Sequence, residues 1–295
     1  MPHQVPWSVW LVTLRPGGYS TPVHGERRGA LCGLLPLRHA LLMIGNWGRP
    51  VERAVRAVRG QSAPVTYGLI ALCCLVFVIG PGSGLSPAYG TGDELLSAQR
   101  AYFERWGVVP VELFEGTPRA AVTPATALFV HGSWLHLLGN MLFLYVFGAM
   151  AEERMGHFAF ALFYLGCGYL ALFGYAAAHS DSAQTLVGAS GAISAVLGSF
   201  LYLFPKARVT SLFPFLFFLP LRFPAWVVLP FWVSLQWMAA SRATQGPAVA
   251  YLAHLLGFSA GFLYAWVRYG RTAAVFSRGT TPGPPAEKTP GREAE

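Results

Sequence analysis

Six apolar segments without Asp, Glu, Lys or Arg constrain this 295-residue chain more than any other feature. A helix needs about 17–25 predominantly apolar residues to cross a bilayer. Charged residues make up only 12% of the chain, against about 25% in a soluble domain. We therefore expect an all-α polytopic membrane protein with six transmembrane helices, and we exclude a soluble enzyme, a disordered scaffold and a disulfide-stapled secreted module. The segments lie at about 64–82, 127–150, 157–178, 186–204, 223–241 and 247–267.

The basic residues indicate how these segments are oriented. The formal net charge is +8, and if the N-terminus is cytoplasmic, sixteen Lys and Arg lie inside and four outside. This bias favours cytoplasmic placement of both termini, and the concentration of charge in the tails argues against nucleic-acid binding. We expect a basic cytoplasmic tail over 1–62, a six-helix core over 63–270 and a disordered cytoplasmic tail over 271–295. No signal peptide is recognised at the start, and residues 30–44 are expected to be interfacial or loosely ordered.

Two apolar stretches do not fit a simple span. The first outer loop, Gly84–Thr126, is too long for a plain connection and contains several aromatic residues. We expect it to fold back onto the membrane surface, with a poorly ordered hydrophilic loop as the alternative. The second stretch, Val209–Leu221, is short and contains prolines, so it is expected to lie along the interface.

Polar side chains within apolar spans are costly and mark candidate functional positions. Ser190 lies in Gly188-Ala189-Ser190-Gly191 in the fourth segment. Such a short motif arises easily by chance, and taken alone it indicates a serine in a helix-packing surface.

His254 in the sixth segment changes this interpretation. Small residues follow it at helical spacing and also occur on the fourth segment, so the two helices can approach closely. Both side chains are expected roughly 6–10 Å below the outer surface, at 1.5 Å per residue. A serine becomes an effective nucleophile when a base accepts its proton, so we interpret Ser190 and His254 as a catalytic dyad. The packing glycines are Gly191, Gly198, Gly257 and Gly261.

The last three segments contain no Asp or Glu. The imidazole would therefore be oriented by packing or by a polar neighbour. A triad would require Asp181 or an acid of the long loop, which we disfavour. A histidine that only packs or gates is the alternative to catalysis.

His136 and Asn140 lie four residues apart on one face of the second segment, near its outer end. A metal site is the less favoured hypothesis for these two residues, because Asn is a poor ligand and no Asp, Glu or Cys lies nearby. We expect hydrogen-bond donors to an oxyanion instead, together with the backbone N–H of Ser190, and no cofactor.

These residues closely resemble the rhomboid intramembrane serine proteases of the bacterial type, over about residues 62–268. The motifs are HGSWLHLLGN at 131–140, Phe147-Gly148, Glu152 and Gly156, GASG at 188–191 and AHLLG at 253–257. The resemblance implies a six-span rhomboid-like bundle with a membrane-associated first outer loop. It also implies Ser190 as nucleophile and His254 as base, with His136, Asn140 and Gly188 supporting the oxyanion. At the inner end of the second span, Glu152 and Arg154 would hydrogen-bond the neighbouring loop.

The resemblance further implies the protein's partners and location. Its substrates would be single-pass or multi-pass membrane proteins, cut near the outer face of a bacterial plasma membrane. Two features depart from the family pattern: Ser194 stands where some relatives have a tyrosine stacked on the histidine, and the long basic N-terminal segment has no counterpart. The competing functions are a client-binding protein of the same fold without proteolysis, and a transporter, which would show repeats or midplane ionisable residues.

Overall fold

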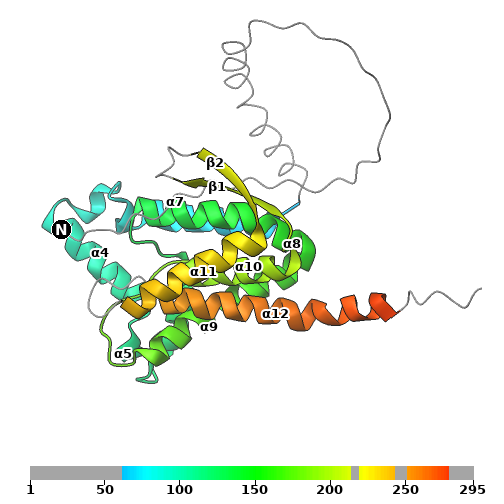
Figure 1. Cartoon of the computed structure of the whole chain (residues 1–295). Coiled ribbons are helices and arrows are strands. Elements are labelled where there is room, and N and C mark those ends of the chain that lie inside the picture. Colours follow the sequence, from blue (N-terminus) through cyan, green and yellow to red (C-terminus); the bar gives the residue numbers. More distant parts are fainter. Residues whose placement is uncertain (1–61, 214–218, 243–250, 279–295) are drawn as a thin grey trace, which may run out of the picture.

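The computed structural model describes residues 62–213, 219–242 and 251–278, and these residues are mostly helical (Figure 1). The expected N-terminal tail and the segment at 30–44 lie outside this range, apart from residue 62. The helices are α3 (Pro64–Ile79), α4 (Asp93–Trp106), α5 (Pro110–Leu113), α6 (Pro118–Thr126), α7 (Trp134–Phe143), α8 (Ala149–Met155), α9 (His157–Ala178), α10 (Ser190–Leu203), α11 (Ala225–Arg242) and α12 (Tyr251–Arg278). Short helical turns lie at η1 (Pro81–Ser83), η2 (Pro87–Tyr89), η3 (Ala127–Phe129) and η4 (Leu144–Gly148), and two strands at β1 (Arg208–Phe213) and β2 (Leu219–Pro224).

Two of the described helical segments are long and apolar enough to cross a membrane. They are Trp134–Met155, in which α7, η4 and α8 run without a break, and His157–Ala178; shorter apolar helices cover Pro64–Ile79, Ser190–Leu203 and Ala225–Ser241. Six spans therefore remain an expectation. The last helix, α12, continues to Arg278, past the expected boundary of the core at 270.

The second apolar segment begins and ends later than expected. Its helix starts at Trp134 because the Ser133 hydroxyl accepts a hydrogen bond from the His136 N–H at 3.2 Å and caps the first turn. Residues Ala127–Phe129 form a separate turn instead. The helix ends at Met155, and the next residue, Gly156, has a φ of +85° in a region that favours glycine.

Helix α10 lies at the centre of the fold. Every residue from Gly191 to Phe200 is buried, and α9, α11, α12 and η4 pack around this helix (Figure 1). Toward its C-terminal end, the rings of Phe200 and Phe147 meet edge to face with centroids 4.9 Å apart. A helix buried on all sides can position a side chain at its end with little freedom.

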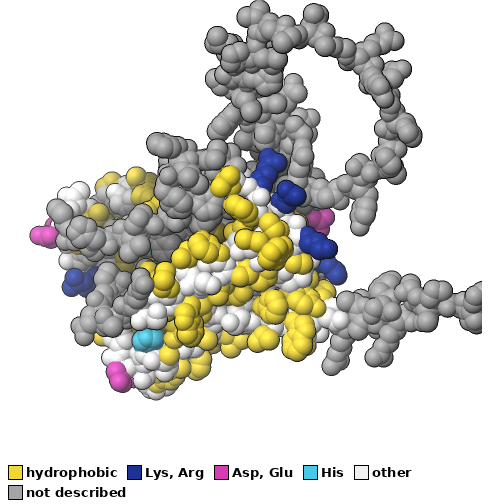
Figure 2. Space-filling model, viewed as in Figure 1, with side chains coloured by type: hydrophobic (Ala, Val, Ile, Leu, Met, Phe, Trp, Pro, Cys, Tyr) yellow, Lys and Arg dark blue, Asp and Glu magenta, His cyan; other side chains and the backbone are white. Residues whose placement is uncertain are grey.

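The outer surface of the bundle is apolar. Figure 2 shows hydrophobic side chains over one face and most of the visible Lys and Arg side chains at one end of it. Large apolar side chains are exposed on the described helices, among them Phe158 at 78%, Trp237 at 68% and Val267 at 62%. An apolar surface this extensive is unfavourable in water and suits lipid chains. The apolar helices and this surface indicate a membrane protein.

The long loop between α3 and α7 is ordered and contains α4, α5 and α6. One of its residues, Val108, pairs with Leu186 through two backbone hydrogen bonds of 2.9 and 2.8 Å. The loop is thereby attached to the chain just before Gly188. Its position on a membrane surface stays a prediction.

The segment at 209–221 contributes to a β-hairpin. Strands β1 and β2 pair antiparallel, with Arg208 opposite Pro224 and Thr210 opposite Arg222. Pairing satisfies backbone N–H and C=O groups that a single extended stretch would leave without partners. The sequence had predicted only an interfacial location here, so the hairpin is an addition from the tertiary structure.

Candidate active site

Ser190 is the first residue of α10, and the turn before it is tightly held. Gly188 has a φ of +122°, a conformation that favours glycine, and its N–H donates to the Ala127 carbonyl at 2.8 Å. The Gly188 N–H already donates to this carbonyl, so it cannot donate to an oxyanion. Gly188 can support an oxyanion only by leaving space that a side chain would fill. The first N–H groups of a helix have no intrahelical acceptor, and that of Ser190 is among them.

The Ser190 hydroxyl contacts the imidazole of His254. The distance from Oγ to Nε2 is 2.9 Å, and His254 is only 3% exposed. The contact joins the start of α10 to the start of α12, 64 residues apart. A neutral Nε2 without a proton can accept the serine proton, as nucleophilic catalysis requires.

The close approach of α10 and α12 makes this contact possible. A side chain at Gly198 would collide with the Phe258 carbonyl, one at Gly257 with the Gly191 carbonyl, and one at Gly261 with the Ala195 carbonyl. At Gly191 an added Cβ would lie 3.0 Å from the Ala171 side chain of α9. Three of the four expected packing glycines thus lie directly between α10 and α12, while Gly191 faces α9 and offers its carbonyl to α12.

The other imidazole nitrogen of His254 has a partner that the sequence analysis missed. Its Nδ1 lies 2.8 Å from Oε1 of Gln236, a residue of α11 that is 7% exposed. The signal was present, because Gln236 is a polar residue within the fifth apolar segment. Spacing alone could not show that it faces α12.

His136 and Asn140 lie against the turn that carries Ser190. A Cβ added to Gly188 would be 2.7 Å from the His136 ring and 3.7 Å from Nδ2 of Asn140. Asn140 is buried, and its Nδ2 has no hydrogen-bond partner among the described residues. A buried amide donor without a partner is unfavourable unless a ligand or transition state uses it.

His131 lies beside this pair. Its ring centroid is 5.2 Å from that of His136, and Nδ1 is 3.4 Å from the Phe129 carbonyl. Within the described residues, no group of three His, Cys, Asp or Glu side chains is arranged to hold a metal ion.

Ser194 contacts the backbone one turn earlier. Its hydroxyl donates to the Ser190 carbonyl at 2.7 Å. The rings of Trp232 on α11 and Tyr251 on α12 lie near the imidazole, with centroids 6.1 and 6.3 Å away. Among the described residues, α11 and α12 therefore both contribute aromatic neighbours to His254.

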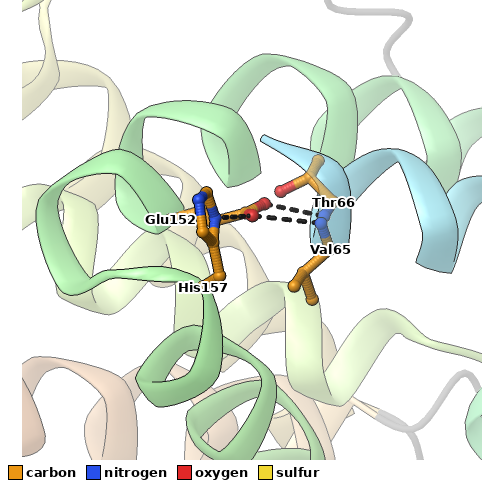
Figure 3. Close-up of polar contacts among 4 residues, drawn as sticks. All are labelled: Val65, Thr66, Glu152 and His157. Carbon is orange, nitrogen blue, oxygen red and sulfur yellow. Dashed lines mark hydrogen bonds and ion pairs between the residues drawn. The ribbon is translucent and has the colours of Figure 1, made fainter. Parts of the chain in front are cut away.

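Glu152 forms a second polar cluster at the other end of the second helical segment (Figure 3). Its buried carboxylate accepts hydrogen bonds from the N–H groups of Val65 and Thr66 at 3.0 and 2.7 Å, and from His157 Nδ1 at 2.6 Å. The partners belong to the first turn of α3 and the start of α9, so the expected bond to a neighbouring loop is instead a bond to a helix end. Arg154 points elsewhere, with its guanidinium 4.9 Å from the Tyr269 ring.

A family model described as "Rhomboid domain" matches residues 119–271, which is more than half of the chain. The chain belongs to the rhomboid family. The match contains every residue of the site described above, from His131 to His254. The helix α3 and most of the long loop precede it.

Two curated rhomboid proteins are similar to parts of this chain. Rhomboid protein 1, mitochondrial, of Saccharomyces cerevisiae is 37% identical over 142 residues, which is 47% of this chain and 39% of the yeast protein. Rhomboid-like protein 11, chloroplastic, of Arabidopsis thaliana is 39% identical over 67 residues, or 23% of this chain and 24% of the plant protein. The matched regions cover well under half of each relative.

Proposed function

We propose that this rhomboid protein is an intramembrane serine endopeptidase that cleaves transmembrane segments of membrane-anchored proteins. The observation that carries the proposal is the 2.9 Å contact between Ser190 Oγ and His254 Nε2. Membership of the rhomboid family supports the same function. The buried donor of Asn140 beside the serine turn adds an element that acyl transfer needs.

The proposed reaction proceeds through an acyl-enzyme. Ser190 Oγ attacks the scissile carbonyl carbon while its proton passes to His254 Nε2. The tetrahedral intermediate then releases the amine, which takes that proton from Nε2 as the C–N bond breaks. Water then attacks the ester carbonyl carbon while its proton passes to the same nitrogen. As the ester C–O bond breaks, Nε2 returns this proton to Ser190 Oγ, and the new carboxyl terminus is released.

The oxyanion of the tetrahedral intermediate needs donors that are already in place. We assign this task to the Asn140 amide, the His136 imidazole and the N–H of Ser190. Gly188 has a supporting role, because any side chain there would occupy the space beside His136. Preorganised donors cost no reorganisation when the charge develops.

The proposed arrangement in the membrane has six spans formed by α3, α7–α8, α9, α10, α11 and α12. Both termini would be cytoplasmic, with Ser190 near the outer face, and the distribution of Lys and Arg supports this orientation. We place the protein in a bacterial plasma membrane. The two relatives are named as mitochondrial and chloroplastic proteins, and cell fractionation distinguishes these locations.

The test is labelling of the detergent-purified protein with a fluorophosphonate probe, which reacts with activated serines. Wild type should be labelled, and Ser190→Ala and His254→Ala should not. Ser199→Ala is the matched control, because this buried serine lies further along α10, donates its hydroxyl to the Val196 carbonyl and should leave labelling intact. A folded wild type that stays unlabelled would overturn the proposal and favour the client-binding function without proteolysis.

A further inference from the structure

The Gln236 side chain is buried between two helices and contacts the proposed catalytic base. It projects from α11, and its Oε1 lies 2.8 Å from Nδ1 of His254 on α12. A glutamine loses favourable hydration and side-chain freedom when it is buried, so its position here needs a compensating interaction. The imidazole supplies that interaction.

This contact determines which nitrogen of His254 carries the proton. A carbonyl oxygen can only accept, so Nδ1 must donate, and a neutral imidazole then has a free lone pair at Nε2. Nε2 is the atom that faces Ser190 Oγ at 2.9 Å. In the opposite tautomer, Nε2 would carry the proton and could not accept one from the serine.

From these contacts we infer that Gln236 is a positioning residue that holds His254 in its base-competent tautomer and orientation. The inference rests on the proposed function and deepens it, because it names a third member of the site and the helix that provides it. Gln236 takes the place that a carboxylate occupies in a Ser-His-Asp triad, but it orients the imidazole without contributing a charge.

A neutral partner has a consequence that can be measured. The titratable side chains around the imidazole include His136 of α7 and Tyr251 of α12. A carboxylate at position 236 would add a negative charge beside Nδ1 and stabilise the protonated imidazole. The acidic limb of the rate profile should then move to higher pH, because the base must lose its proton before it can act.

Three variants test the inference through the rate of fluorophosphonate labelling as a function of pH. Gln236→Met keeps the length of the side chain but has no strong acceptor, and it should label about 10- to 100-fold more slowly, the range expected when a buried donor loses its partner. Gln236→Glu keeps an oxygen acceptor for Nδ1, so it should label faster than Gln236→Met and approach the wild-type rate. The acidic limb of its pH–rate profile should lie at higher pH than that of wild type. Ser234→Ala changes an exposed residue of the same helix and should behave as wild type.

The outcomes separate this inference from the proposed function. If wild type is not labelled, the proposed function fails. If wild type is labelled and Gln236→Met reacts at the same rate, the positioning role is wrong. If Gln236→Met does not fold, the pH profile of labelling for Gln236→Glu tests the inference instead. An acidic limb at higher pH than in wild type supports it. An unchanged acidic limb would mean that residue 236 does not interact with His254.

Discussion

Gly261 of α12 lies directly against the carbonyl of Ala195 on α10, with no room for a side chain between them. This approach brings the N-terminal ends of the two helices together. It thereby sets the separation of Ser190 and His254, which each lie within the first turn or so of their helix. Local packing seven residues away from His254 therefore controls the geometry of the site.

Gly261→Ala should separate the two helices. We expect a loss of about 1–3 kcal/mol in the free energy of unfolding, as for other overpacked positions, and slower labelling of Ser190. Gly166→Ala in α9 is the control, because nothing lies within 4 Å of an added Cβ there. Thermal unfolding in detergent measures the stability of both variants. Equal stability of Gly261→Ala and Gly166→Ala would contradict the close approach of α10 and α12.

Asn140→Ala should slow the reaction without unfolding the protein. Loss of one oxyanion donor typically costs about 10²–10³ in rate, and the Nδ2 that is removed has no partner among the described residues. The rate of fluorophosphonate labelling measures this effect. Leu138→Ala, at a 59% exposed position of the same helix, should keep the wild-type rate. A wild-type rate for Asn140→Ala would remove this residue from the site.

Glu152→Gln should destabilise the bundle. The carboxylate accepts from two backbone N–H groups of α3, and an amide would turn one acceptor into a donor facing one of them. A buried donor left without its acceptor costs about 1–3 kcal/mol. The neighbouring Glu153 is exposed, so Glu153→Gln should change stability by less than about 0.5 kcal/mol. Similar unfolding temperatures for both variants would argue that the hydrogen bonds from the first turn of α3 to Glu152 do not stabilise the bundle.

The orientation can be tested by cysteine labelling in intact cells. In a background without the four native cysteines, we expect a membrane-impermeant maleimide to label Glu115→Cys in the long loop but not Lys206→Cys. Both positions are exposed, so permeabilised cells should show labelling at both. The reverse pattern in intact cells would invert the proposed topology.

Most residues of the candidate site could be predicted from the sequence. Ser190, His254, His136 and Asn140 stand out as polar residues in apolar segments, and family motifs identify the same four. Gln236 has the same signature but belongs to no such motif, so its relation to His254 appears only when α11 is packed on α12. The partners of Glu152 were misassigned for a similar reason, since the start of α3 is 86 residues away in sequence.

The membrane class, the apolar segments and the small residues that allow helices to touch could all be predicted from the sequence, because hydrophobicity and helical spacing are local properties of the chain. Three relations emerge from the packed fold instead: the glycines of α12 meet backbone carbonyls of α10, Gln236 contacts Nδ1 of His254, and strands β1 and β2 pair as a hairpin. These relations depend on the relative rotation and depth of separate helices, and on pairing between distant backbone groups. Those quantities arise from packing of the whole bundle, which no single segment encodes.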